Sequence, residues 1–211
     1  MDPSLKVQWL GRRPYREVHD LQQGLLVERI QEGTSDMLLL VEHYPVVTLG
    51  RGTEGGAADY VMVPVIPVER GGEATYHGPG QLVAYPIREL LPGHRDLHAY
   101  LRSLEDVVID VLADFGVVGG RIEGKTGVWI EDRKVASIGV AVRRWVTWHG
   151  VAINVTTDLE QFASFRPCGL DSEVMTRLAD HAKVPCDLEA VGNSFQAHFA
   201  RRFGYDQVVL V

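Results

Sequence analysis

The sequence predicts an α+β (mixed α/β) domain, in which a mixed, largely antiparallel sheet is flanked by helices packed on one side. Two observations support this fold class. Apolar residues recur at helical spacing in two separate stretches, residues 18–30 and 97–115. Between residues 117 and 155, four β-rich runs follow one another with only short polar or glycine-containing turns between them. Because composition does not change abruptly along the 211 residues, we expect a single domain over residues 1–211.

The N-terminal half is expected to contain one helix and several short strands. The helix lies within residues 17–33, and Gly33 is a plausible C-terminal stop. Residues 61–69 are rich in β-branched side chains but interrupted by two prolines, which suits an edge strand. Residues 70–81 hold four glycines and a proline, so they are expected to form a loop or a tight connection between strands. Further short strands are expected at residues 37–43, 45–50 and 82–87.

The C-terminal half is expected to start with the clearest amphipathic helix, residues 97–115, which ends at Gly116. An antiparallel meander then follows, with strands at residues 117–124, 126–132, 134–142 and 148–155. After it we expect a loop at residues 164–170 and a short helix at residues 173–181. A closing helix and a last strand complete the prediction, at residues 188–203 and 206–211.

Composition narrows the classes of function. Twenty-eight acidic and twenty-one basic residues give a net charge of −7, a field that repels nucleic acid. No apolar stretch approaches the roughly 18 residues of a membrane span, and the N-terminus lacks the apolar core of a signal peptide. Two cysteines do not make a disulfide framework. We therefore expect a cytoplasmic protein that binds neither nucleic acid nor a membrane.

The glycine-rich segment RGGEATYHGPGQ, residues 70–81, is the first candidate for a ligand site. Glycines allow backbone N–H groups to approach a bound carbonyl or phosphate closely, although a glycine-rich hairpin without a ligand explains the segment equally well. It is neither a P-loop nor a dinucleotide-binding motif. Because the sequence also lacks C-x-x-C, H-E-x-x-H and paired histidines at ligand spacing, we expect no metal and no cofactor.

A nucleophile and a base can each be suggested from local sequence. Cys168 is flanked by proline and glycine in an expected loop, which favours exposure, whereas Cys186 fits a small buried residue better. No histidine is an obvious partner by position. Lys134 opens an apolar strand, where partial burial would favour the neutral amine that base chemistry needs. A lysine at this place in a strand is, however, commonly a surface residue.

Five motifs, in this order, resemble those of the lipoyl(octanoyl) transferases of lipoate biosynthesis: RGGEATYHGPGQ, KTGVWI, KVASIG, HGVAINV and PCGL. EHYPVVTLGRG, nearer the start, resembles the first core strands of the same family. The similarity thus runs from about Val41 to Arg177. It implies the fold of the catalytic domains of biotin and lipoate ligases, a mixed sheet flanked by helices.

The resemblance also implies a set of site residues. The family pairs a cysteine nucleophile with a lysine, which correspond to Cys168 of PCGL and Lys134 of KVASIG. Ser137 stands where relatives often carry alanine. The positions that the resemblance places around the acyl group are Arg70, Gly71, Gly72, Glu73, Ala74, Thr75, Tyr76, His77, Ser137, Ile138, Gly139, Gly150, Val151 and Ala152.

By resemblance, the chain transfers an octanoyl or similar medium-chain acyl group from acyl carrier protein, through a Cys168 thioester, to a lysine. The implied acceptors are the lipoyl domains of 2-oxoacid dehydrogenase complexes and the glycine cleavage H protein. Because a thioester is already activated, the reaction needs no ATP. Three alternatives stay open: an ATP-dependent lipoate or biotin ligase, a thioesterase, and an acyl-binding module without turnover.

Overall fold

The computed structural model describes residues 4–54, 61–164 and 174–211. Its helices and strands, in chain order, are β1 (Ser4–Arg13), α1 (Tyr15–Glu32), β2 (Asp36–His43), β3 (Val46–Leu49), β4 (Val65–Pro67), β5 (Ala74–His77), β6 (Gln81–Ile87), α2 (Leu97–Asp114), β7 (Gly120–Ile122), β8 (Lys125–Ile130), β9 (Arg133–Arg143), β10 (Val146–Asn154), α3 (Leu188–Phe203) and β11 (Gln207–Leu210). Among these described helices, none has the length and apolar character to span a membrane.

The strands of the described ranges form one large and one small sheet. The large sheet has eight strands in the order β11-β1-β2-β6-β10-β9-β8-β7, and the small one has three in the order β4-β3-β5. In the large sheet β1 pairs in parallel with β2 and β11, whereas the other neighbouring pairs are antiparallel. The predicted mixed, largely antiparallel sheet is therefore confirmed.

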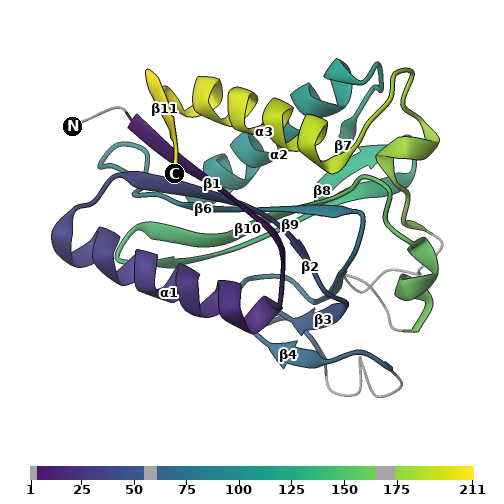
Figure 1. The fold of residues 1–211 in the computed structure, drawn as a ribbon, viewed down its shortest axis with the longest axis horizontal. Helices are drawn as coiled ribbons and strands as arrows, with labels where there is room; N and C mark the ends of the chain where they lie inside the picture. Colours follow the sequence, from purple (N-terminus) through teal and green to yellow (C-terminus); the bar gives the residue numbers. More distant parts are fainter. Residues whose placement is uncertain (1–3, 55–60, 165–173) are drawn as a thin grey trace.

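Helices cover both faces of the large sheet, so the expectation that they pack on one side is wrong. α2 and α3 lie against one face and α1 lies against the other, as Figure 1 shows. Strand β2 explains this arrangement: Leu38 and Leu40 join the core under α2 and α3, whereas Leu39 and Val41 pack towards α1. Because successive side chains of a strand point to opposite faces, one uninterrupted apolar run serves both layers.

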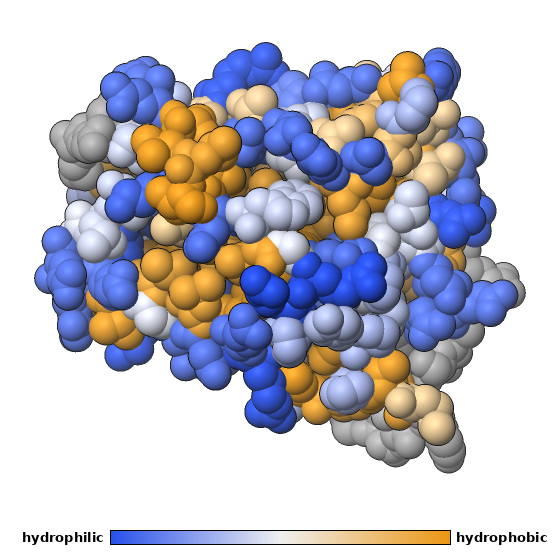
Figure 2. All heavy atoms as spheres, in the orientation of Figure 1, coloured by the Kyte–Doolittle hydropathy of each residue, from blue (hydrophilic) through white to orange (hydrophobic). Residues whose placement is uncertain are grey.

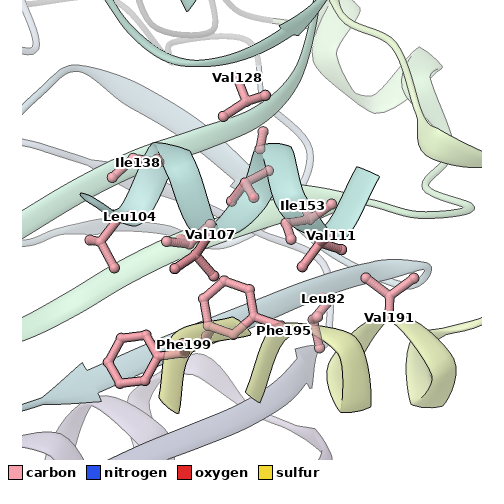
Figure 3. Close-up of a cluster of buried hydrophobic side chains, with 14 of the residues drawn as sticks. Leu82, Leu104, Val107, Val111, Val128, Ile138, Ile153, Val191, Phe195 and Phe199 are labelled. Carbon is pink, nitrogen blue, oxygen red and sulfur yellow. The ribbon is translucent and has the colours of Figure 1, made fainter. Parts of the chain in front are cut away.

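The larger core lies between the sheet and the α2–α3 pair. Figure 3 shows buried side chains of the two helices and of the sheet converging there, among them Leu82, Leu104, Val107, Val111, Val128, Ile138, Ile153, Val191, Phe195 and Phe199. On α2 and α3 these positions recur every three or four residues, which is the spacing that predicted both helices.

The ends of the helices follow from local sequence. The Asp96 carboxylate accepts a hydrogen bond from the backbone N–H of Ala99 (3.0 Å), and that of Asp187 accepts one from Ala190 (2.8 Å), so both helices have N-terminal caps. Gly33 ends α1 in the left-handed conformation, with φ of 66°. These boundaries agree with the predicted helices to within about two residues, as expected for helix ends.

Two segments differ from the expectations. The sequence did not predict β1, in which buried and exposed side chains do not alternate regularly. The expected short helix at 173–181 is wrong for its described part, because residues 174–181 contain no α-helix and Leu178–Asp180 forms a 3-10 turn. There Met175 forms a β-bridge with Lys134 instead, and the backbone N–H of Thr176 donates to the carbonyl of Lys134 (2.9 Å). Tertiary pairing thus replaces helical hydrogen bonds.

The glycine-rich segment is also more regular than a loop. Its centre forms the buried strand β5, which pairs antiparallel with β3. The expected edge strand at 61–69 shortens to β4, but it does lie at an edge of the small sheet. The expected loop at 164–170 falls almost wholly outside the described residues.

Strand β11, the expected last strand, forms one edge of the large sheet. In Figure 2 hydrophobic residues gather at the upper left, where Figure 1 places β11 and the C-terminus. The side chains of Val208, Val209 and Leu210 are 42%, 42% and 72% exposed. This edge therefore presents apolar side chains to solvent, far along the sheet from the strands that carry the candidate motifs.

Candidate active site

A cavity of about 240 Å³ lies on the α1 side of the large sheet, where the glycine-rich segment covers β9 and β10. Most of the residues expected around the acyl group line it together: Arg70, Gly71, Gly72, Glu73, Thr75, His77, Ser137, Ile138, Gly139, Gly150, Val151 and Ala152, along with Lys134. Segments distant in the sequence thus share one wall, because the backbone N–H of Gly71 donates to the carbonyl of Val140 on β9 (3.0 Å) and β9 pairs with β10.

Two of the expected residues turn away from the cavity. Ala74 and Tyr76 pack into a separate buried cluster with Val47 and Phe162, whereas Thr75 and His77 line the cavity. The alternation of side chains along β5 causes this split. Because the segment was expected to be a loop, the sequence could not separate the two faces.

The Arg70 side chain fixes the shape of the glycine-rich segment. Its guanidinium donates from Nη1 to the carbonyls of Gly71 (3.1 Å) and Glu73 (2.8 Å), and from Nη2 to the carbonyl and hydroxyl of Thr48 (2.9 and 2.8 Å). Gly139 allows the segment to lie on β9, since a Cβ there would come within 3.0 Å of the carbonyl oxygen of Gly71. Arg70 therefore holds backbone around the cavity, and glycine provides the close approach.

A chain of buried hydrogen bonds runs behind the cavity. The Thr48 hydroxyl donates to Nε2 of His77 (3.4 Å), and Nδ1–H of His77 donates to the amide oxygen of Gln81 (2.8 Å). The side-chain NH₂ group of Gln81 donates to Oδ1 of Asn154 (3.0 Å), and the side-chain NH₂ group of Asn154 donates in turn to the carbonyl of Thr176 (3.0 Å). Each partner is satisfied, so the network orients His77 as the neutral Nδ1–H tautomer.

Burial keeps the histidines of this region neutral. It lowers the pKa of His77 well below its usual 6.5, and His43 nearby lowers it further. Burial also lowers the pKa of His149 to about 3, assisted by His19 and Arg70. The His149 backbone has a φ of 57°, which is uncommon for a residue with a side chain. The cavity wall therefore offers imidazoles that accept or donate hydrogen bonds without carrying charge.

Lys134 brings an amine to the cavity from the start of β9. Its side chain is 4% exposed, and its Nζ lies 5.7 Å from the centre of the Trp129 ring. A surface position, the simpler interpretation of the sequence, is therefore excluded for this lysine. The apolar wall of the cavity, formed by Val83, Ile138 and Val151 among others, faces the same space.

The two cysteines are in different situations. Cys168, the expected nucleophile, lies outside the described residues. Cys186 is partly buried against the larger core, and burial together with the charge of Asp187 raises the pKa of its thiol. A raised pKa reduces the thiolate fraction, so Cys186 is a poor nucleophile.

Sequence reasoning missed several residues of the cavity wall. Tyr15, Val83 and Tyr85 line it, and they come from the start of α1 and from β6. His149 lines it too, although its position near a glycine-containing turn gave only a weak signal. For Tyr15 no local signal existed, because its place depends on how α1 packs against the small sheet, where its ring stacks on that of His77 (5.9 Å between centroids).

One group of side chains has the composition of a metal site. Candidate ligand atoms of His19, Glu69 and His149 lie within 4.8 Å of one another. Nε2 of His19 is 3.0 Å from Oε2 of Glu69, and Nε2 of His149 is 3.7 Å from the same oxygen. The first pair is a hydrogen bond, which satisfies both groups without an ion. The three residues come from α1, the segment before the glycines and β10, so no sequence spacing reveals them.

The cavity thus joins an apolar wall to a buried amine and a rigid, glycine-lined rim. Known proteins with similar sequences are acyl-transferring or lipoate-attaching enzymes by name. Residues 14–200 match the family model described as the lipoyl protein ligase A/B catalytic domain. An octanoyltransferase of Solibacter usitatus is 45% identical over 206 residues, covering 94% of this chain and 93% of its own. An octanoyltransferase of Gloeobacter violaceus is 47% identical over 199 residues, covering 92% and 88%.

A solved structure shows the same fold at low sequence identity. A putative lipoate protein ligase from T. acidophilum with bound lipoic acid superposes with a TM-score of 0.79 at 19% identity, covering 100% of this chain and 90% of its own. The expected ligase-like fold is therefore confirmed. With a matching family model over most of its length and relatives well above 40% identity, the chain belongs to the lipoyl protein ligase A/B catalytic-domain family.

Proposed function

We propose that the chain accepts an octanoyl group from an acyl carrier protein as a thioester on Cys168 and passes it to a lysine of a lipoyl domain. It is an acyltransferase related to octanoyltransferases, and octanoyl transfer in protein lipoylation follows from that relationship. The carrier donor, the thioester and the catalytic pair are our proposal. The observation that carries it is the cavity in which the buried amine of Lys134 meets an apolar wall.

In the first half-reaction the Cys168 thiolate attacks the carbonyl carbon of the carrier thioester, and the carrier thiolate leaves. Lys134 accepts the proton of the Cys168 thiol and gives it to the departing carrier sulfur. In the second half-reaction the acceptor amine attacks the Cys168 thioester, an amide forms and the Cys168 thiolate leaves. Lys134 takes the proton that the amine loses. Neither half-reaction consumes an oxidant or a nucleotide, because the thioester is already activated.

The rigid rim supports the transfer by holding the acyl carbonyl in place. Backbone held by Arg70 cannot collapse into the cavity, so any N–H group that faces the carbonyl is already oriented before the reaction. We propose the lipoyl domains of 2-oxoacid dehydrogenase complexes and the glycine cleavage H protein as acceptors. The cytoplasmic location stays a prediction from the sequence.

The acyl-enzyme is the direct test of the nucleophile. Incubation with octanoyl carrier thioester and no acceptor should add the mass of one octanoyl group to the peptide that contains Cys168. Cys168→Ser should abolish transfer, because a hydroxyl is a poor nucleophile without a strong base. Cys186→Ser is the matched control and should retain the wild-type rate. An adduct found only on Cys186, or full activity in Cys168→Ser, would contradict the proposal.

The role of Lys134 can be separated from that of a fixed positive charge. Lys134→Arg keeps the charge but cannot release a proton, and Lys134→Met keeps only the aliphatic stem. If Lys134 moves protons, both variants should lose single-turnover acylation and deacylation across pH. Near-normal rates for the arginine variant in both half-reactions would leave only an electrostatic role.

The rival functions predict different requirements and products. A strict need for ATP with free fatty acid as donor would favour a ligase, and release of free octanoic acid from the carrier thioester would favour a thioesterase. Binding of the thioester without any transfer or release would favour an acyl-binding module. Measuring amide product and free acid in the same reaction, with and without ATP, distinguishes all of them from the proposed transferase.

A further inference from the structure

Glu105 is a buried carboxylate that the proposed mechanism does not use. It lies in the middle of α2, its side chain is 1% exposed, and its neighbours Leu104 and Val107 belong to the larger core. A carboxylate in such surroundings is strongly destabilising unless it is paired and hydrogen-bonded. Its presence under the sheet therefore requires an explanation from its partners.

Each oxygen of Glu105 has its own partners. Oε2 accepts hydrogen bonds from Nε of Arg121 (2.6 Å) and Nη1 of Arg102 (2.7 Å). Oε1 accepts one from the backbone N–H of Gly127 (3.1 Å). The two arginines thus fix the carboxylate, and the carboxylate fixes the backbone of β8 at Gly127.

Gly127 lies directly against the Lys134 side chain. Its φ is 124°, and a Cβ there would come within 2.7 Å of Cε and 3.3 Å of Nζ of Lys134, and within 2.5 Å of the carbonyl oxygen of Ala136. The ladder between β8 and β9 is irregular at this point, since Val128 pairs with Ala136 but Trp129 pairs with Lys134. Strand pairing alone therefore leaves the contact loosely defined.

We infer that Glu105 is a positioning residue: by holding the Gly127 backbone against Lys134, it sets where the lysine amine lies in the cavity. This inference rests on the proposed role of Lys134. Glu105 itself is not among the residues that line the cavity, so it acts through Gly127 and touches no reacting atom. A purely structural role, in which Glu105 only joins α2 to β8, predicts a loss of stability without a change in the chemistry of Lys134.

Asp106 provides a matched control on the same helix. Like Glu105, it forms an ion pair with Arg121, and it also pairs with Arg202. Its side chain is 29% exposed, and none of its hydrogen bonds and ion pairs within the described residues reaches Gly127. Removing its charge perturbs the same arginine without releasing the Gly127 backbone.

The test compares Glu105→Gln, Asp106→Asn and Lys134→Met with the wild type in single-turnover acylation. The carboxylate of Glu105 accepts three hydrogen bonds with two oxygens. A glutamine has one carbonyl oxygen, and its NH₂ group donates, so it cannot accept hydrogen bonds from both arginines and Gly127. We expect Glu105→Gln to lower the acylation rate about 10- to 100-fold with little change in apparent affinity for the carrier thioester, as for other residues that orient a reacting group. Asp106→Asn should stay near the wild-type rate.

A second readout follows the amine without relying on activity. Lys134 is labelled with an amine-reactive anhydride at a series of pH values, and the extent of labelling is measured on the peptide that contains it. The dependence of labelling on pH should change in Glu105→Gln but not in Asp106→Asn. If Glu105→Gln is too unstable, Glu105→Asp is measured instead: it keeps the charge, but its shorter side chain cannot reach the Gly127 N–H and both arginines together. The same pattern is expected.

The outcomes separate this inference from the proposed function. A wild-type rate and labelling profile in Glu105→Gln would overturn the positioning role, and so would equal losses in Glu105→Gln and Asp106→Asn. Wild-type acylation by Lys134→Met would refute the catalytic role of the lysine instead. In that case the labelling profile would still report whether Glu105 positions the amine.

Discussion

Acidification to about pH 5 should destabilise this protein through three buried histidines, well before its carboxylates are protonated. His43, His77 and His149 are each at most 5% exposed. Burial lowers the pKa of His43 to about 4 and that of His149 to about 3, and it lowers that of His77 well below 6.5. His43 is already satisfied as a neutral ring, since it donates to the carbonyl of Arg13 (3.0 Å) and accepts from the Tyr85 hydroxyl (2.9 Å).

The change in the free energy of unfolding with pH depends on how many more protons the unfolded chain binds than the folded chain. Below about pH 6.5 the unfolded chain takes up a proton at each histidine, whereas the folded chain does not, so the free energy of unfolding falls as pH falls. At about pH 5 the loss is about 2 kcal/mol for each of His43 and His149, and His77 changes the free energy of unfolding in the same direction. The loss from His43 and His149 together, about 4 kcal/mol, is a large part of the stability of an ordinary domain.

Urea denaturation at about pH 7 and about pH 5 measures the effect. His43→Gln removes one titrating group, so the difference between the two free energies of unfolding should shrink by about 2 kcal/mol, although the variant is less stable at both pH values. His94→Gln, at an exposed position, is the control and should leave the difference unchanged. Equal stability of the wild type at both pH values, within about 1 kcal/mol, would refute the reasoning.

Three further predictions concern packing and the thiols. Gly150→Ala should lower the free energy of unfolding by about 3 kcal/mol in urea denaturation, since a Cβ there would lie 2.2 Å from the carbonyl oxygen of Ala84; an unchanged midpoint would contradict the tight packing. Gly24 lies in the middle of α1 with nothing within 4 Å of a side-chain carbon added there, so Gly24→Ala should raise the free energy of unfolding by about 0.5 to 1 kcal/mol. A decrease would argue against α1 being helical there. Cys186→Ser should leave the octanoyl transfer rate within about twofold, and a large loss would reopen the choice of nucleophile.

Much of the secondary structure could be predicted because it depends on neighbouring residues. The apolar spacing of α2 and α3, with caps at Asp96 and Asp187, is a local pattern, and so is the run of strands that became β8, β9 and β10. The segment after Met175 could not be predicted this way, because its backbone pairs with Lys134 across the sheet instead of forming the expected helix.

For the candidate site, the sequence by itself determined the motifs and the family that they resemble, hence the residues expected near the acyl group. It also determined that Lys134 opens a strand. Only the tertiary structure decided that Ala74 and Tyr76 face away from the cavity, and that Tyr15 and Tyr85 help to line it. The physical reason is that periodicity reports whether a side chain is buried, whereas sheet order and helix packing decide which distant side chains it meets.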